Sequence, residues 1–347
     1  MQCIGIIAAV KRPYFFEVFA FANLAVILFI ARASLPIIGS PLSHLAAFSL
    51  GIGMQAIAGI VVRVVIALVR RDRTYLTAIR DRAWIADTLR LVVFGAMVIV
   101  AYGSIKLVVP IYHPRLFDPE LWELDRALFF GIAPTTFFLD LFGARPFLRV
   151  IDWTYANIFF ASASIAYAWV LSHPERRIRI AFANGNALLW ISGGWLYLLL
   201  PSLGPALRFP DVWLAHAEGL RLTQGLQAIL MRNYQNVIRA SHGMPITEPI
   251  RIVFGIGAFP SLHVAFQMYV FLWARRVWRA GLVLFGIFVL LIFLGSMITG
   301  WHYLIDSLAG LLMAYLSYRI CFPKHVDNDR TTDAGRSAGG ENSPGSA

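Results

Sequence analysis

Charge is scarce in this chain of 347 residues: charged residues make up 14% of it, against about 25% in an average soluble protein. Hydrophobic residues make up 59% of the chain and gather in long runs. This balance excludes an ordinary soluble domain and places the chain in a lipid bilayer.

Cysteine is nearly absent as well, since the chain holds only Cys3 and Cys321. Both lie near chain ends that we expect to be cytoplasmic, so a disulfide framework is neither needed nor expected. The carboxylates are scattered, and no cluster of histidine, aspartate and glutamate has the spacing of metal ligands, so we expect neither a metal nor another cofactor. No basic stripe interleaved with aromatic residues occurs in a polar region, so we expect no nucleic-acid partner.

The net charge of +11 comes almost entirely from arginine, and its placement indicates its role. The arginines cluster in short loops between apolar runs, at 70–73, 176–179 and 275–279. Short loops rich in arginine stay on the cytoplasmic side of a membrane. The charge therefore indicates topology.

Eight segments have the roughly 20 apolar residues that a helix needs to cross a bilayer. They lie at about 14–32, 43–69, 91–112, 147–172, 180–200, 259–275, 280–298 and 302–321. The arginine-rich loops share one side if both termini are cytoplasmic. The opposite compartment then receives the loops at 33–42, 113–146, 201–258 and 299–301. We predict an all-α, polytopic transmembrane helical bundle of about eight spans.

Both ends of the chain differ from the spans. An apolar run precedes Lys11 and Arg12, the reverse of the order in a signal peptide, so we expect no cleavage. The tail at 323–347 is polar and rich in glycine and serine, and we expect it to be disordered and cytoplasmic. Residues 1–112 form N-terminal transmembrane helices, and 113–322 form a second membrane region.

Some polar features lie within or beside the spans. Glu17 and Arg63 fall inside apolar segments, where we expect snorkelling or a neighbouring partner to satisfy them. The loops at 113–146 and 201–258 are too long for simple turns. We expect both loops to lie along the membrane surface.

Two short stretches at the starts of the sixth and eighth spans hold the residues that can do chemistry. One is Gly-Ile-Gly-Ala-Phe-Pro-Ser-Leu-His at 255–263, and the other is Trp-His-Tyr-Leu-Ile-Asp at 301–306. His302 and Asp306 are four residues apart, so a helix would place them on one face. If the carboxylate accepts a hydrogen bond from one ring nitrogen, the other nitrogen is unprotonated, as a nucleophilic histidine requires.

The 255–263 stretch has the features of a phosphate site. Pro260 is a good first helical residue, and the N-terminus of a helix attracts anions. Gly257 permits close approach of the backbone, and the Ser261 hydroxyl is a further donor. We expect these groups to hold a phosphate, and a protonated His263 to act as general acid on the leaving oxygen. Each stretch alone would also suit ordinary interfacial residues, but the two lie on one membrane face.

The phrase Gly-Ala-Phe-Pro-Ser-Leu-His, followed by His302 and Asp306, resembles the type 2 phosphatidic acid phosphatase superfamily, in particular the branch that includes fungal inositol phosphorylceramide synthase. The resemblance implies that 113–322 is a catalytic membrane domain with the six-helix core of that family. It also implies that His263 protonates the leaving group, His302 forms a phosphohistidine and Asp306 supports it. The likeness is specific at 254–310.

Two further stretches are more loosely similar to that branch. Residues 197–205, followed by Arg208, resemble the segment after the preceding span, and 124–131 with Pro134 resembles the branch's N-terminal region. The resemblance makes Arg208 a candidate phosphate contact, and an ordinary interfacial arginine is the alternative.

The sequence also departs from the wider family. The pattern Lys-x6-Arg-Pro is absent, and Gly295-Ser296 stands where a Ser-Arg pair precedes the second histidine. A phosphate-binding arginine is therefore missing, which fits the synthase-like branch better than typical phosphatases. We expect the transition-state charge to be balanced by an arginine of the long outer loop, with the candidates Arg208, Arg232, Arg239 and Arg251.

Three functions remain open. The first is a phosphotransferase that moves an inositol phosphate-like headgroup between lipids through a phosphohistidine. The second is hydrolysis of a lipid phosphate or diphosphate at the same site. The third is a lipid-binding protein without chemistry, against which the retained His263, His302 and Asp306 argue. All three have membrane lipids as partners, and the first two have an active site that faces the extracytoplasmic side. The first two predict a bell-shaped pH profile without divalent metal, because a neutral His302 and a protonated His263 must coexist.

Overall fold

The computed structural model describes residues 13–215 and 217–322. Within this part of the chain the regular elements are helices, and no strand occurs. The all-α prediction is therefore confirmed. The expectations about residues 1–12 and about the tail at 323–347 lie outside the described residues.

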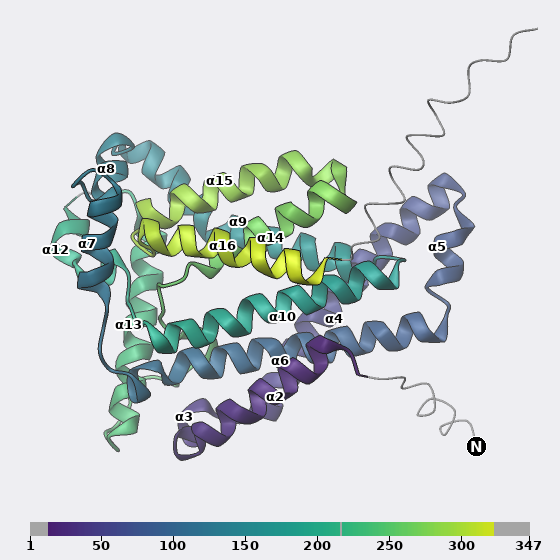
Figure 1. Cartoon of the computed structure of the whole chain (residues 1–347), viewed down its shortest axis with the longest axis horizontal. Helices are drawn as coiled ribbons and strands as arrows, with labels where there is room; N and C mark the ends of the chain where they lie inside the picture. The colour runs from purple at the N-terminus through teal and green to yellow at the C-terminus, as the bar shows by residue number, and fades with distance from the viewer. Residues whose placement is uncertain (1–12, 216, 323–347) are drawn as a thin grey trace, which may run out of the picture.

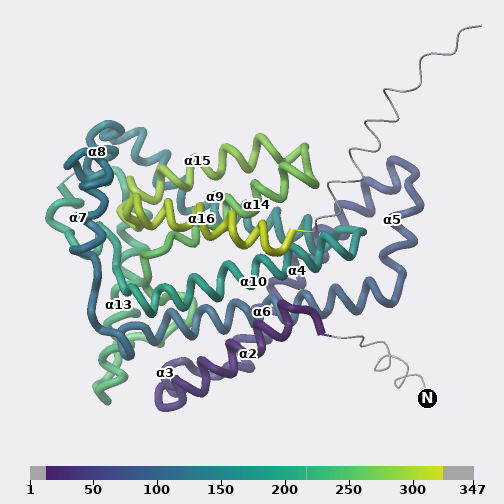
Figure 2. Tube along the Cα trace, viewed as in Figure 1, coloured from purple at the N-terminus to yellow at the C-terminus, as the bar shows by residue number. Residues whose placement is uncertain are grey.

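Each of the eight predicted segments overlaps one long helix, although the helix at the third segment begins at Arg82, nine residues before the predicted start. These helices are α2 (Phe15–Ile30), α4 (Pro41–Arg70), α6 (Arg82–Tyr112), α9 (Arg145–Leu171), α10 (Arg176–Leu199), α14 (Leu262–Val277), α15 (Leu282–Ile298) and α16 (Leu304–Cys321). A helix suits these apolar runs because a backbone in lipid must satisfy its own hydrogen bonds. Figures 1 and 2 show α6, α10 and α16 running side by side along the long axis of the molecule, with α14 against α16.

The chain is a multi-pass membrane protein, although fewer than eight helices meet a simple test of length and hydropathy. Within the described residues α4, α6, α9, α16 and a helix that includes α15 meet it, and a sixth span results if α2 and residues 32–38, bent by 77°, are counted as one. Helix α14 has 16 residues and is too short for the test. Asn184 and Asn186 lower the hydropathy of α10.

The two long loops form further helices across one end of the bundle. Residues 113–146 contain α7 (Asp118–Leu128) and α8 (Pro134–Leu141). Residues 201–258 contain α11 (Pro205–Arg208), α12 (Pro210–Leu214), α13 (Arg221–Ser241) and the 3-10 turn η2 (Ile252–Phe254). Figure 1 shows α7, α8, α12 and α13 gathered at this end, with α13 lying across the direction of α10 and α16. The remaining short elements are η1 (Arg32–Ser34), α3 (Leu35–Ile38), α5 (Arg73–Ala78) and η3 (Arg279–Gly281).

The charges inside the apolar spans have partners, as expected. Arg90 of α6 donates to the carboxylate of Glu17 in α2. Arg63 of α4 donates to the hydroxyl of Ser172 at 2.9 Å and to the carbonyl of Trp169 at 3.3 Å. Both interactions join neighbouring helices and thereby link parts of the bundle.

Helix α4 crosses α9 at very short range. A Cβ atom at Gly59 would overlap the carbonyl oxygen of Ala168, so only glycine fits at this crossing. Small residues at such crossings let membrane helices approach closely. The crossing joins the N-terminal helices to the rest of the bundle.

We expect Gly59→Ala to destabilise the protein by about 1–3 kcal/mol, because the added methyl group overpacks the crossing. Gly53→Ala on the same helix is the control, since a Cβ there meets open space. This control should gain about 0.5–1 kcal/mol from helix propensity. Thermal unfolding in detergent measures both, and shifts of the same sign and size would contradict the close crossing.

Candidate active site

The two histidines singled out by the sequence lie together at the end of the bundle where α14 and α16 begin. Nδ1 of His263 is 3.3 Å from Nε2 of His302. His263 is the second residue of α14, and His302 lies in the turn between α15 and α16. His302 is only 2% exposed. His302 is therefore held in a desolvated environment, and His263 is partly buried beside it.

A backbone carbonyl orients the His302 ring. Nδ1 of His302 donates to the carbonyl oxygen of Ala258 at 2.8 Å. The nearest carboxylate oxygen of Asp306 is 3.6 Å from the same nitrogen, beyond ordinary hydrogen-bond range. With the proton on Nδ1, the lone pair of Nε2 faces His263. The spacing predicted a direct hydrogen bond from the ring to Asp306. The ring nitrogen instead donates to the carbonyl of Ala258, and the carboxylate of Asp306 lies farther away.

Asp306 is engaged by the start of its own helix. Its Oδ2 accepts the backbone N–H of Tyr303 at 2.8 Å, and its backbone carbonyl accepts the N–H of Ser261 at 2.9 Å. His302 precedes α16, so the spacing of four does not place both side chains on one helical face as predicted. Asp306 is fully buried and links the starts of α14 and α16.

The structure separates the residues predicted to bind phosphate. Gly257 lines a cavity beside the histidines, and a Cβ there would lie 2.7 Å from the ring of Tyr197. Ser261 is fully buried and caps α14 by accepting the N–H of Val264 at 3.4 Å. The helix starts at Leu262, two residues after Pro260, the expected first helical residue, and Ser261 is the N-cap.

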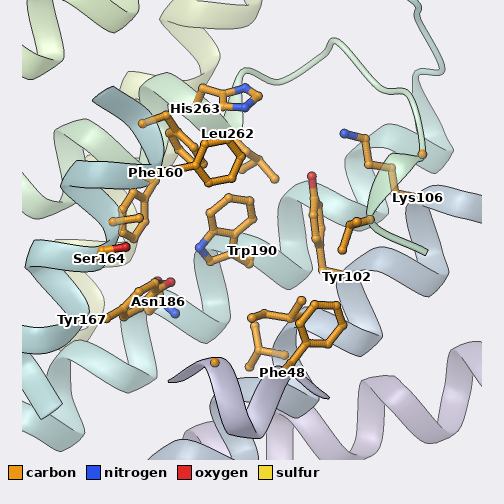
Figure 3. A pocket seen from close by; sticks show the side chains of 18 of the residues that line it. Phe48, Tyr102, Lys106, Phe160, Ser164, Tyr167, Asn186, Trp190, Leu262 and His263 are labelled. Atoms are coloured by element: carbon orange, nitrogen blue, oxygen red, sulfur yellow. Dashed lines mark hydrogen bonds between the residues drawn. The ribbon is translucent and has the colours of Figure 1, made fainter. Parts of the chain in front are cut away.

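A cavity of about 610 Å³ extends from the histidines into the bundle. Its walls come from α4, α6, α9, α10, α13 and α14, and most of its lining side chains are aromatic or aliphatic. Figure 3 shows His263 and Lys106 at one end, Phe48 at the other and Trp190 between them. Leu91 and Lys106 both line it, a separation along α6 of roughly 22 Å at 1.5 Å per residue. The cavity suits a lipid chain with its polar group at the histidine end.

Lys106 provides the positive charge at the polar end. It is the only lysine in residues 13–322 and, besides His263 and His302, the only basic residue among the described residues that line the cavity. Its Nζ lies 5.1 Å from the ring centre of Tyr197. A Cβ at Gly255 would lie 2.9 Å from Lys106 Cγ, so glycine lets the 252–257 segment pack against this lysine.

The sequence contained a signal for Lys106 that our interpretation missed. Lys106 is followed after six residues by His113-Pro114, so the chain has Lys-x6-His-Pro where the wider family has Lys-x6-Arg-Pro. Because histidine stands in place of the arginine, the sequence does not match the complete family pattern, and the lysine of the partial match was not identified. Nδ1 of His113 lies 2.8 Å from the carbonyl oxygen of Leu198, so this ring is directed at α10.

The loop arginines expected to balance the charge lie away from the cavity. Arg232 pairs with Glu248 at 3.1 Å, and Arg239 donates to a carbonyl of its own loop. Arg208 is exposed at the end of α11. Neither these arginines nor Arg251 lines the cavity within the described residues.

Burial sets the protonation of His302. Desolvation lowers the pKa of His302 to about 3, and the nearby Lys106 acts in the same direction. The ring is therefore neutral at physiological pH, as a nucleophile must be. In the described part of the chain no group of three or more histidine, cysteine, aspartate or glutamate residues could hold a metal ion.

Two facing histidines and a buried aspartate, at the end of a helical membrane bundle and beside a long apolar cavity, are the arrangement of a membrane phosphatase or phosphotransferase. A family model described as PAP2 superfamily matches residues 119–320, more than half of the chain. The chain belongs to this superfamily, that of the type 2 phosphatidic acid phosphatases. Membership supports activity as a lipid phosphatase or phosphotransferase. No curated protein and no solved structure matches the chain.

We expect Lys106→Met to lower kcat/KM by about 100-fold, the usual cost of removing one group that stabilises transition-state charge. Lys106→Arg should recover part of the activity. Arg115→Met is the control, because Arg115 is exposed and its ion pair with Glu120 lies outside the cavity. Turnover of a labelled lipid phosphate measures all three, and wild-type turnover by Lys106→Met would remove this lysine from the site.

Proposed function

We propose that the chain is a lipid phosphotransferase that carries a phosphoryl-headgroup on His302 and passes it to the hydroxyl of a second lipid. One observation carries the proposal: Nε2 of His302 faces Nδ1 of His263 at 3.3 Å, at the polar end of an apolar cavity. The resemblance of 255–263 to the inositol phosphorylceramide synthase branch supports transfer and an inositol phosphate-like group.

In the first half-reaction, Nε2 of His302 attacks the phosphorus of the donor lipid. A P–N bond forms while the P–O bond to the donor's alcohol breaks. The incoming phosphate displaces the contact between the histidines, and His263, which enters this step as the imidazolium, gives one proton to the leaving oxygen and becomes neutral. Lys106 balances the charge on the phosphoryl oxygens. The products are the phosphohistidine and a lipid alcohol.

In the second half-reaction, the acceptor hydroxyl attacks the same phosphorus. His263 takes the hydroxyl proton, a new P–O bond forms and the P–N bond to His302 breaks. Ala258 keeps the ring tautomer constant throughout, because its carbonyl holds the proton on Nδ1. His302 thus returns to its neutral resting form.

The lining of the cavity supports a lipid alcohol as the acceptor. A site walled by apolar side chains excludes water and stabilises lipid chains. Hydrolysis is the second candidate, and Lys106 favours it, since this lysine belongs to the near-match with the phosphatase pattern. Both functions use the same histidines and differ in the group that attacks the phosphohistidine.

The catalytic unit draws on both membrane regions of the chain. The 113–322 region supplies the histidines and Asp306, whereas 1–112 supplies Lys106 and Phe48 to the cavity. We place this site on the extracytoplasmic side and both termini in the cytoplasm, on the strength of the arginine-rich loops.

The test uses purified protein in lipid nanodiscs with phosphatidylinositol or phosphatidate labelled at phosphorus, with and without a lipid alcohol. We expect label in a new lipid only when the alcohol is present, and its loss in His302→Ala. His242→Ala is the control, because His242 is exposed in the long outer loop. Excess EDTA should leave the turnover unchanged.

Free labelled phosphate regardless of alcohol would establish hydrolysis instead. Equal turnover by His302→Ala and wild type would overturn both functions. An absolute requirement for magnesium would contradict the mechanism without metal.

A further inference from the structure

Helix α7 carries two buried carboxylates whose role the reaction alone does not explain. Asp118 is 0% and Asp125 is 1% exposed, although α7 lies at the outer end of the bundle. Burying a carboxylate is costly unless strong donors compensate it. The partners of these two residues therefore indicate what the burial achieves.

Asp125 binds the start of the helix that follows His302. Its two oxygens accept the backbone N–H groups of Leu304 at 2.6 Å and Ile305 at 2.8 Å. These are the first two residues of α16, whose N–H groups have no partner within the helix. Asp125 thereby fixes the chain immediately after His302.

Asp118 binds Tyr303, the residue after His302, and the loop at 203–204. It accepts the hydroxyl of Tyr303 at 2.8 Å and the N–H groups of Leu203 at 3.0 Å and Gly204 at 2.9 Å. The hydroxyl of Tyr303 and the loop at 203–204 are thus held by one carboxylate. The residue after His302 is therefore anchored twice, through its side chain by Asp118 and through the following N–H groups by Asp125.

The loop at 202–204 leads on to the carbonyl that orients the ring. Ser202 accepts the N–H of Ala258 through its carbonyl and the N–H of Phe259 through its hydroxyl, both at 3.0 Å. Ala258 in turn accepts the Nδ1–H of His302. One helix therefore supports His302 along two routes, through its own chain and through its hydrogen-bond acceptor.

We propose that Asp118 and Asp125 are positioning residues, and that α7 is a clamp that aims Nε2 of His302 at the phosphorus. The proposal rests on the proposed role of His302 and holds for transfer and for hydrolysis. It also gives a role to the two stretches, 124–131 and 197–205, whose resemblance to the synthase branch had no assigned role.

The titration of Asp125 separates positioning from simple stabilisation. Burial raises the pKa of Asp125 to about 6, and the charge of Asp306, which faces it from α16, acts in the same direction. Asp118 and Tyr303 are the other ionisable groups of this cluster. Above about pH 6 the carboxylate accepts both N–H groups, whereas the protonated acid accepts one well. Activity should therefore fall as the pH drops through this value.

The stability contribution of Asp125 changes in the opposite direction. Its pKa is raised from 3.8 in the unfolded chain to about 6 in the folded protein, so the folded state holds the proton more tightly. The raised pKa therefore adds to the free energy of unfolding in full below pH 3.8, and this stabilisation is lost as the pH rises to about 6. His302, with a pKa of about 3, does not titrate in this window.

The experiment measures the pH profiles of kcat and KM for Asp125→Asn in nanodiscs, with labelled phosphatidate as donor. We expect kcat to fall by about 100-fold, the cost of a misplacement near 1 Å, while KM stays within about threefold. The acid limb near pH 6 should disappear, because asparagine does not ionise. Asp125→Glu should retain an acid limb.

Two control variants identify a purely structural effect. Asp152, 3% exposed, accepts the N–H groups of Leu222 at 2.7 Å and Thr223 at 2.8 Å, the same two-bond cap on a helix without a histidine. Asp152→Asn should lose similar thermal stability and keep the acid limb. Glu123→Gln, on the exposed face of α7, should change neither property.

The proposal is overturned if Asp125→Asn keeps the wild-type kcat, or if its acid limb remains near pH 6. An equal loss of kcat together with loss of the acid limb in Asp152→Asn would also overturn it, since an effect common to both caps would then account for the pH dependence. Full turnover by His302→Ala would instead overturn the proposed function, whatever Asp125→Asn does.

Discussion

The start of a buried helix presents backbone N–H groups that need acceptors, and this need organises the outer end of the protein. Such groups cost several kcal/mol when they are buried without partners. Aspartates meet the need: Asp125 at α16, Asp152 at α13, and Asp306 at the turn before its own helix. Because Asp125 and Asp152 stand on neighbouring elements, satisfying the N–H groups also sets where the helices begin. His302 directly precedes the start of α16, so the position of this histidine depends on the cap that Asp125 provides.

The long helices and the paired histidines were predictable from sequence for related reasons. A long apolar run in lipid has the helix as its one satisfactory backbone structure, so each expected segment overlaps a helix. Topology then brought His263 and His302 to one face.

The hydrogen-bond acceptor of His302 was not predictable, because any residue has a backbone carbonyl like that of Ala258 and the sequence does not show which one is used. Lys106 was not predicted as a site residue, because it lies on α6, far from the histidines in sequence, and its motif differs from the family pattern by one residue. Ser261 shows why a role is hard to assign from sequence, because a hydroxyl before a helix can cap it as readily as bind phosphate.

The cavity connects the physical environment with the choice of reaction. Its apolar length suits lipid chains, and His263, His302 and Lys106 line its polar end. Desolvation keeps His302 neutral and strengthens the attraction between Lys106 and a phosphate. In the proposed function, the same apolar lining favours a lipid hydroxyl over water as the acceptor. Transfer and hydrolysis thus use the same catalytic groups and differ in whether the cavity admits a lipid alcohol or water as the acceptor.

Direct detection of the covalent intermediate tests the central claim, that Nε2 of His302 is the nucleophile. The enzyme is mixed with phosphatidylinositol labelled at phosphorus, quenched under conditions that preserve phosphohistidine, and digested for mass spectrometry. The account predicts label on the peptide that contains His302, also in His242→Ala, and none in His302→Ala. Label on another residue, or turnover without labelled protein at any time, would contradict it.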